Sequence, residues 1–223
     1  MAATEGRPRF LSALPPAHAE ALLALGRPRR YAEGAALFHE RQPGDRVLVL
    51  LSGRVKLCSL SSDREVILGI REPGDLLGEM SVLDGRPRGA SAIALEPVEA
   101  RVIPAADFDG FLARTPAAGL ALARLLSARL RDADIKRAEH LGKDSLGRVC
   151  ARLVELCDRF GTAGGDEVAI DLAMNQEDLA AWTGSSREAA TKALRTLREL
   201  GLIRTGRRTI TVLDPVALRR RAL

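Results

Sequence analysis

The chain has 223 residues, of which 46% are hydrophobic and 28% are charged, and its formal net charge is +5. A typical domain has about 150 residues, so this length allows one large or two modest domains, and the composition excludes a disordered or collagen-like protein. Apolar runs such as Val47–Leu51 are far shorter than the ~20 residues of a membrane helix. Met1–Pro16 also has no apolar stretch typical of a secretory signal, so we expect a cytoplasmic globular protein without a membrane partner.

The first hundred residues predict a helix followed by many strands. Residues 1 to about 28 are predicted to be helical, around a Pro15-Pro16 start. From Tyr31 to Ile103 the chain alternates between short apolar runs and turn residues such as Pro43-Gly44. The clearest runs are Arg46–Leu51, Arg54–Leu60, Glu65–Ile70 and Val98–Ile103. Turn signals at a spacing of roughly ten residues are typical of antiparallel sandwiches or barrels, so the first domain is predicted to be an all-β roll.

A long helix is predicted next, from Pro116 to about Leu141, with a length of about 37 Å. One stripe of this helix carries residues at steps of three and four: Leu122, Leu126, Leu130, Ala133 and Arg137. A small domain cannot bury so long a helix alone, so the stripe favours a parallel dimer seam. Packing of the helix only against its own β-roll is the alternative. The pattern is interrupted at Gly142–Asp144, where Asp144 can cap the next helix, and we place a hinge there.

The last 80 residues predict a winged helix-turn-helix. Its expected elements are a helix from Asp144 to about Phe160, a Gly-rich turn at Gly161–Gly165, a strand at Glu167–Leu172, helices near Asn175–Trp182 and Ser186–Leu200, and a hairpin returning at Thr209–Leu213. Between Asp144 and Gly184 there are three basic and eight acidic residues, whereas Ser185–Leu223 has ten basic and three acidic ones. A concentrated positive end favours a polyanion such as nucleic acid, with a solvated basic tail as the alternative.

The second short helix of this segment has the pattern of a DNA-reading helix. Five of its polar residues are predicted to face outward: Arg187, Glu188, Thr191, Lys192 and Arg195. Inward packing is predicted for Leu179, Ala180, Ala190, Leu194 and Leu197. Arg187 can pair with guanine O6 and N7, Glu188 can accept from cytosine N4, and Lys192 can reach guanine or phosphate. Glu188 has a competing role, since Ser185-x-x-Glu188 is also a capping box if Ser185 is the N-cap.

The predicted DNA-contacting set is wider than these side chains. It comprises Asn175, Gln176, Ser185, Ser186, Arg187, Glu188, Thr191, Lys192, Arg207 and Arg208. Arg204 and Arg207-Arg208 lie in the predicted wing, where they would contact phosphates without reading sequence. Arg219–Arg221 would do the same, or else form a solvated tail.

A second group of candidate site residues lies between Pro73 and Ser91. Gly78 lets the backbone approach a ligand, and Glu79 supplies a carboxylate for sugar hydroxyls. Arg88, followed by the small residues Gly89 and Ala90, offers a guanidinium and exposed backbone N–H groups. A carboxylate for ribose and an arginine with amides for phosphate describe a pocket for a nucleotide monophosphate.

Cysteine and histidine usage argues against a metal centre. Cys58, Cys150 and Cys157 form no CxxC motif, and an odd count argues against a disulfide framework. Cys150 and Cys157 lie seven residues apart, one heptad on a helix, and core packing is their expected use. His18, His39 and His140 are scattered, which leaves little for a zinc site or a histidine-based catalytic centre. We therefore expect neither a metal nor a catalytic residue.

These motifs together resemble the Crp-Fnr family of transcription regulators over roughly residues 10 to 215. The resemblance implies an α+β fold: a cyclic-nucleotide-binding β-roll (a double-stranded β-helix or jelly roll) in residues 1–115, a dimerisation helix and hinge in 116–143, and a winged helix-turn-helix in 144–223. Gly78–Arg88 is similar to the family's phosphate-binding cassette, in which the glutamate holds the ribose 2′-hydroxyl and the arginine holds the cyclic phosphate. Gly184–Glu188 with Lys192 is similar to its recognition helix.

The resemblance also implies a ligand set: Gly78, Glu79, Met80, Arg88, Gly89, Ala90, Arg129 and Asp134. Arg129 is expected to reach Glu79, as a comparable arginine does in the family. Gly89 stands where some members have a serine that meets the phosphate. A Thr-Ser pair that touches adenine in cyclic AMP-responsive members corresponds to Ala133 and Asp134 here. Asp134 can accept from an exocyclic amine, but pairing with Arg131 or Arg137 on its own helix is slightly favoured.

The expected function is a homodimeric regulator that binds an inverted-repeat DNA operator under the control of a cyclic nucleotide, cyclic AMP rather than cyclic GMP. RNA polymerase is a further partner implied by the resemblance. An iron–sulfur sensor would need cysteines before Cys58, and a haem sensor would have only His39 and Cys58 as ligands. Two rival functions stay open: a constitutive DNA-binding protein with a vestigial β-roll, and a nucleotide-processing enzyme with Glu79 as base, for which the cassette offers no partner histidine or lysine.

Overall fold

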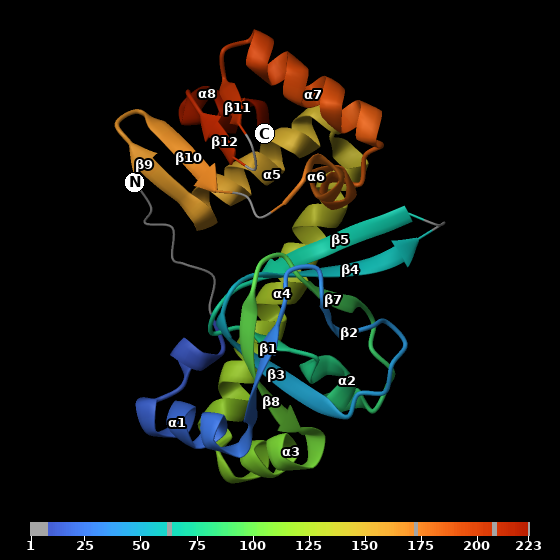
Figure 1. Ribbon diagram of the computed structural model, residues 1–223, viewed down its shortest axis with the longest axis vertical. Helices are drawn as coiled ribbons and strands as arrows, with labels where there is room; N and C mark the ends of the chain where they lie inside the picture. The colour runs from blue at the N-terminus through green and yellow to red at the C-terminus, as the bar shows by residue number, and fades with distance from the viewer. Residues whose placement is uncertain (1–8, 62–63, 172–173, 207–208, 223) are drawn as a thin grey trace. The chain divides into compact units, whose positions relative to one another are not determined.

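The computed structural model describes residues 9–61, 64–171, 174–206 and 209–222. These residues divide into two compact units, one with residues 9–61 and 68–133, the other with residues 64–67, 134–171, 174–206 and 209–222. We call them the N-terminal unit and the C-terminal unit, and each is described by itself (Figure 1). Within the described ranges, none of the helices carries an apolar stretch long enough to cross a bilayer.

The strands of residues 27–104 form two antiparallel four-stranded sheets, which belong to the N-terminal unit except for residues 64–67. The first has the order β1 (Arg27–Tyr31), β8 (Val98–Pro104), β3 (Arg46–Ser52) and β6 (Leu76–Leu77). The second has the order β2 (Ala36–Phe38), β7 (Ser91–Ala94), β4 (Val55–Ser61) and β5 (Arg64–Arg71). The helical elements are η1 (Leu11–Ala13), α1 (Pro16–Leu25), α2 (Glu79–Asp84) and α3 (Ala105–Arg114). The predicted β-roll is confirmed.

Strand β3 explains how two cores share one sheet. Val47 and Val49 point into a core that α1, α3 and the start of the long helix close, with Phe10 and Phe108 at its centre. Leu48 and Leu50 point to the other side, into the core between the two sheets. Because successive side chains of a strand face opposite ways, a strand buried on both faces must be apolar throughout. The continuous run Val47–Leu51 therefore marks a central strand.

Strand β1 differs from the prediction, because it begins at Arg27 where the sequence analysis expected helix to about residue 28. Its first four residues are exposed and lack apolar alternation, so no local pattern marks them as a strand. They are extended because they pair with β8, in a register that sets Arg27 opposite Val102. Pro28 fits there because β1 is an edge strand, and one side of its backbone needs no ladder hydrogen bonds. The short strands β2, β6 and β7 were also not predicted.

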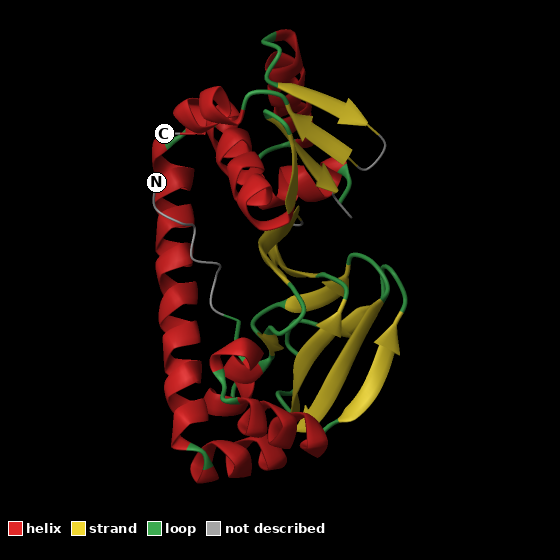
Figure 2. Cartoon of the chain, turned by 90° about the vertical axis from the view of Figure 1, so that its left-hand side faces the viewer, coloured by secondary structure: helices red, strands yellow, loops and turns green. Residues whose placement is uncertain are grey.

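The predicted long helix is α4 (Pro116–Gly142), and Figure 2 shows it as a single uninterrupted helix. The predicted stripe is wrong in its first half. Leu122 is buried and Leu126 is half-buried, and both pack on the core beneath α1 and α3. The leucines that α4 leaves exposed are Leu120, Leu130 and Leu141. The helix thus uses one face for its own β-roll and keeps another free.

The C-terminal unit contains the last turns of α4, four further helices and one four-stranded sheet. The helices are α5 (Ser145–Phe160), α6 (Gln176–Thr183), α7 (Arg187–Glu199) and α8 (Pro215–Ala222). The sheet has the order β11 (Ile203–Gly206), β12 (Thr209–Val212), β10 (Glu167–Asp171) and β9 (Gly161–Gly164). The predicted Gly-rich turn is wrong, because Gly161–Gly164 pairs with β10 as a strand. Asp144 caps α5 as predicted, its carboxylate accepting from the Gly147 N–H.

Candidate functional site

The segment from Gly78 to Arg88, which contains α2 and the loop after it, places two charged side chains in the interior of the N-terminal unit. Glu79 is 3% exposed and Arg88 is 2% exposed. Gly78, which precedes α2, has a φ of 77°, a conformation that favours glycine. A side chain at this position would also overlap the Arg88 guanidinium. Both requirements explain why glycine stands there.

The Arg88 guanidinium is held by main-chain oxygens. Its Nη1 donates to the Gly78 carbonyl at 2.7 Å, and its Nη2 donates to the Arg46 carbonyl at 2.6 Å. Asp45 Oδ1 lies 3.7 Å from Nη2, and the guanidinium carbon lies 4.6 Å from the centre of the Phe38 ring. Burial lowers the pKa of Arg88, while the Asp45 carboxylate opposes that shift. Among the described residues the buried Nε has no hydrogen-bond partner, so a donor is available for an anion.

The Glu79 carboxylate pairs with Arg129 from α4, as predicted. Arg129 Nη1 donates to Glu79 Oε1 at 2.6 Å, and its Nη2 donates to the Leu76 carbonyl at 2.8 Å. Arg129 Nη2 also lies 3.8 Å from Asp75 Oδ1. The hydrogen bond from Arg129 holds one carboxylate oxygen of Glu79 and thereby fixes the orientation of the carboxylate.

The other predicted ligand residues occupy more open positions. Gly89 is exposed, and a side chain there would meet open space. Ala90 is half-buried and Met80 is exposed. Asp134 is exposed on α4, just past the boundary between the units. Within the described part of the chain Asp134 makes no ion pair with Arg131 or Arg137, so the favoured local pairing is wrong, and a ligand contact of Asp134 stays a prediction.

The helix-turn-helix of the C-terminal unit consists of α6, a turn at Gly184 and α7. Gly184 has a φ of 60° and ends α6. The N-cap of α7 is Ser186 and not Ser185, because the Ser186 side chain accepts from the Ala189 N–H. The capping box with Glu188 is consequently absent from α7. A capping box is present instead at α6, where Asn175 and Asp178 exchange side-chain and backbone hydrogen bonds.

The predicted division of α7 into two faces is confirmed. The five residues expected to face inward across α6 and α7 are all buried, and Arg187, Glu188, Thr191, Lys192 and Arg195 are all exposed. Arg187 Nη1 pairs with Glu177 Oε1 at 2.7 Å on the surface. The pKa of Glu188 lies below its usual range because its carboxylate accepts from its own backbone N–H and from the Ser186 hydroxyl. The start of α7 therefore presents the positive charge of Arg187 and the negative charge of Glu188 at the surface.

The remaining predicted DNA-contacting residues have different surroundings. Asn175 is engaged as the N-cap of α6, while Gln176 is exposed. Arg204 is exposed and pairs with Glu167 at 3.1 Å, whereas Arg207 and Arg208 lie outside the described residues. Arg219–Arg221 belong to α8, which packs on α5, so they form no loose tail, but all three are exposed and contact with phosphates stays a prediction. Arg219 pairs with Asp158, and this raises the pKa of Arg219.

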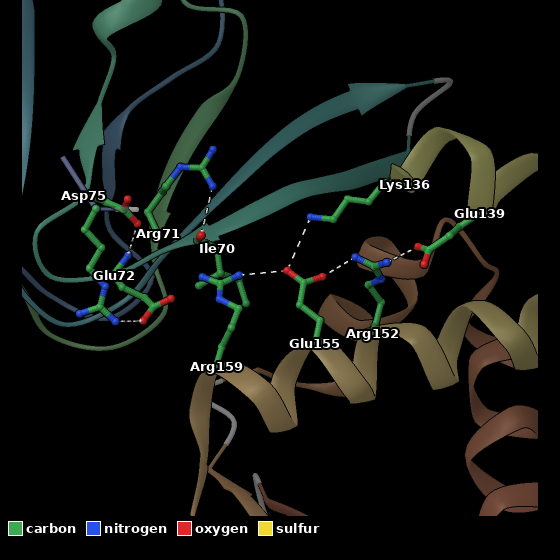
Figure 3. Close-up of polar contacts among 10 residues, drawn as sticks. Ile70, Arg71, Glu72, Asp75, Lys136, Glu139, Arg152, Glu155 and Arg159 are labelled. Atoms are coloured by element: carbon green, nitrogen blue, oxygen red, sulfur yellow. Dashed lines mark hydrogen bonds and ion pairs between the residues drawn. The ribbon is translucent and has the colours of Figure 1, made fainter. Parts of the chain in front are cut away.

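Two arginines of α5 contact the helix-turn-helix or the end of α4, and the sequence analysis did not single them out. Arg148 donates to the Thr183 carbonyl at 2.8 Å and to Ser185 Oγ at 3.3 Å, which fixes the turn between α6 and α7. Arg152 is 6% exposed and pairs with both Glu139 and Glu155 (Figure 3). Their spacing of four residues places both on one face of α5, and a basic pair on one face of an otherwise acidic segment is the signal that could have found them.

The three cysteines behave as core residues. None of them forms a disulfide bond; Cys58 and Cys150 are buried and Cys157 is half-buried. Burial raises the pKa of the Cys150 and Cys157 thiols to about 11, so little thiolate is present near neutral pH. This agrees with packing as their use.

Comparison with known proteins supplies the context for these sites. The family model of the cyclic nucleotide-binding domain matches residues 28–115, and that of the Crp-like helix-turn-helix domain matches residues 147–221. The chain is 34% identical to the CRP-like cAMP-activated global transcriptional regulator of Mycobacterium tuberculosis, over 87% of this chain and 88% of that protein. It is 31% identical to the cyclic AMP receptor protein of Thermus thermophilus, over 96% of both.

A solved structure supports the fold. The c-di-GMP-responsive global regulator CLP of Xanthomonas campestris superposes with a TM-score of 0.79 over 89% of this chain and 99% of that chain, at 23% identity. At that identity the likeness concerns the fold alone.

Proposed function

The chain belongs to the Crp-Fnr family of transcription regulators, and from this premise we propose that it is a homodimer that binds an inverted-repeat operator under the control of cyclic AMP. Its DNA-binding and cyclic nucleotide-binding domains follow from the family. We further propose that residues 1–115 form the effector domain, 116–143 the dimerisation helix and hinge, and 144–223 the DNA-binding domain. RNA polymerase is the proposed partner in activation.

One observation carries the effector proposal: the carboxylate of Glu79 and the guanidinium of Arg88 are both buried within one turn-helix segment. Burying a charged group is costly unless it is used or compensated, and Glu79 is compensated by Arg129 while Arg88 Nε keeps a free donor. A carboxylate for the ribose 2′-hydroxyl and a guanidinium for the cyclic phosphate would use both groups. Cyclic AMP is the proposed ligand because two relatives of this chain are named for it.

Calorimetric titration of nucleotide-stripped protein with cyclic AMP and cyclic GMP tests the effector. We expect cyclic AMP to bind in the micromolar range or tighter and to raise the affinity for operator DNA in a parallel fluorescence-anisotropy assay. Operator binding that neither nucleotide changes would favour the second candidate, a constitutive regulator. The exposed Gly89 and Asp134, where cyclic AMP-responsive members have other residues, are the observations that keep this candidate open.

The dimer proposal rests on the exposed leucines of α4. Leu120, Leu130 and Leu141 are spaced by ten and eleven residues, which is three turns of a coiled coil with 3.5 residues per turn. They are 54%, 64% and 80% exposed, so the described chain leaves an apolar stripe uncovered. A second copy of α4 with the same stripe would cover it symmetrically.

Leu130→Ala is expected to weaken the dimer by about 30-fold, because two copies each lose roughly 1 kcal/mol of apolar burial. Sedimentation equilibrium measures the dissociation constant. Val216→Ala in α8 is the matched control, since Val216 is 61% exposed and does not belong to the stripe. Equal dissociation constants for the two variants would contradict the proposed seam.

For DNA reading, Arg187→Ala is expected to reduce the preference for operator over random duplex by about 5- to 150-fold for each half-site, because a bidentate arginine–guanine contact supplies about 1–3 kcal/mol of discrimination. Competition binding at a fixed salt concentration measures this preference. Arg195→Ala, which removes another exposed arginine of α7, should weaken operator and random duplex alike. An unchanged preference in the Arg187 variant would place base reading elsewhere.

A further inference from the structure

One guanidinium of α5 joins the ends of two helices in the C-terminal unit. Arg148 Nη1 donates to the Lys143 carbonyl at 2.7 Å, and Lys143 directly follows the last residue of α4. Arg148 Nε donates to the Thr183 carbonyl at 2.8 Å, and Thr183 is the last residue of α6. Carbonyls at the C-terminal end of a helix lack partners within the helix and carry partial negative charge. Arg148 therefore satisfies one carbonyl at each end with a charge-assisted hydrogen bond.

The same guanidinium holds the turn that leads into α7. Only Gly184 and Ser185 separate Thr183 from Ser186, which is the N-cap of α7. Arg148 Nη2 donates to Ser185 Oγ at 3.3 Å, in addition to the bond from Nε to the Thr183 carbonyl. A turn of two residues that is held at Ser185 and at the residue before it leaves the direction of α7 little freedom. Arg148 thereby fixes α7 to the end of α4.

The end of α4 also touches this turn directly. The His140 ring lies so close to Gly184 that a side chain at Gly184 would press on it. The bond from Arg152 to Glu139 ties the last turns of α4 to α5, but it does not reach the turn between α6 and α7. The hydrogen bonds of Arg148 run from the end of α4 to the turn itself.

We infer that Arg148 is a positioning residue that sets the spacing of the two DNA half-sites, by holding α7 in one orientation relative to the end of α4. In the proposed dimer the two copies of α4 form the seam, so the distance and angle between the two α7 helices depend on how each is held to its own α4. Half-sites about 34 Å apart, one helical turn of DNA, are selected only if this link is rigid. The inference rests on the proposed dimeric, operator-binding function.

The preference for one half-site spacing is the readout, because a general loss of stability or of DNA affinity lowers binding at every spacing alike. The operator is selected with the unsubstituted chain and cyclic AMP from a pool of inverted repeats. Competition binding at a fixed salt concentration compares it with the same half-sites separated by two additional base pairs, which moves one half-site by about 7 Å and turns it by about 70°. Arg148→Gln is expected to lower this preference about tenfold, within the ~5- to 150-fold range of couplings between sites. A duplex with a single half-site should bind the variant as it binds the unsubstituted chain.

Two further variants sharpen the test. Arg148→Lys keeps the positive charge but lacks the planar fork that reaches both carbonyls, so it should also lower the spacing preference. It carries the test if circular dichroism shows that Arg148→Gln does not fold. Arg198→Gln removes an exposed arginine from the last turn of α7 and should leave the preference unchanged.

The outcomes separate the inference from the function beneath it. If the unsubstituted chain is monomeric or binds both spacings equally, the proposed dimeric function fails and the role of Arg148 fails with it. If the chain prefers one spacing and the folded Arg148 variants keep that preference, only the role of Arg148 is overturned. Weaker binding of the single half-site with an unchanged spacing preference would mean that Arg148 only stabilises the helix-turn-helix, which also overturns the inference.

Discussion

Replacement of Arg88 by glutamine is expected to weaken cyclic AMP binding by about 1,000-fold. The guanidinium is the buried cation of the proposed phosphate site, and two charge-assisted hydrogen bonds at roughly 2 kcal/mol each account for this loss. Glutamine keeps a hydrogen-bond donor but no charge, so the variant tests the ionic part of the interaction. Calorimetric titration with cyclic AMP measures the effect.

Arg88 also donates to the carbonyls of Gly78 and Arg46, so thermal unfolding must be followed in the same preparations. Arg86→Gln is the matched control, because Arg86 is an exposed arginine of the same loop. We expect it to bind cyclic AMP like the unsubstituted chain. Comparable affinities for the Arg88 and Arg86 variants would show that the cyclic phosphate is bound elsewhere, and Arg88 would then be a structural residue.

Arg152→Met is expected to destabilise the C-terminal unit by about 3 kcal/mol. Removing one partner of a buried ion pair costs about 3–5 kcal/mol, and the lower end applies because Glu155 keeps Lys136 and Arg159 as partners. Methionine preserves most of the volume against Trp182, whose ring lies 5.9 Å from the guanidinium carbon. The loss of stability therefore measures the removal of the charge and not the creation of a cavity.

Urea unfolding followed by tryptophan fluorescence measures this loss, because Trp182 is the only tryptophan of the chain and is buried in the C-terminal unit. Arg195→Met provides the comparison, since Arg195 also pairs with a glutamate, at 2.8 Å from Glu199, but on the surface. An exposed pair contributes at most about 1 kcal/mol. Equal losses in the two variants would mean that burial does not strengthen the Arg152 contacts.

The Arg152 contacts also bear on the hinge. Glu139 belongs to the last turns of α4, and its bond to Arg152 of α5 ties those turns to the C-terminal unit. Lys143 adds a second tie by donating to the Ala222 carbonyl of α8. The structural boundary accordingly lies inside α4, between Ala133 and Asp134, and not at the glycine that ends the helix. A hinge at Gly142–Asp144 stays a prediction about motion.

Much of the fold could be predicted because its patterns are local. The four predicted strands agree with β3, β4, β5 and β8 to within one or two residues, since alternating or continuous apolar runs and flanking turns are properties of short stretches. The division of α7 into buried and exposed faces follows from the helical period alone. The motif from Gly78 to Arg88 likewise marked the residues that the fold buries together.

The elements that were missed depend on partners distant in sequence. Arg27–Tyr31 is a strand only because β8 pairs with it, and Gly161–Gly164 is a strand only because β10 does. Arg148 and Arg152 acquire their roles from Thr183, Ser185 and Glu139, none of which adjoins them in the sequence. No local propensity encodes these contacts.

The sequence by itself determined the class of each domain, the long helix, the two faces of α7 and the charged residues of the proposed nucleotide site, because periodicity and turn chemistry act over a few residues. Only the tertiary structure decided which face of α4 packs on the β-roll, which serine caps α7, and how Glu79, Asp75 and Arg129 come together. Burial is the physical reason. A helix has several faces that could pack, and a charged side chain has several partners that it could pair with. The tertiary structure selects among them because it decides which faces and which charges are removed from water.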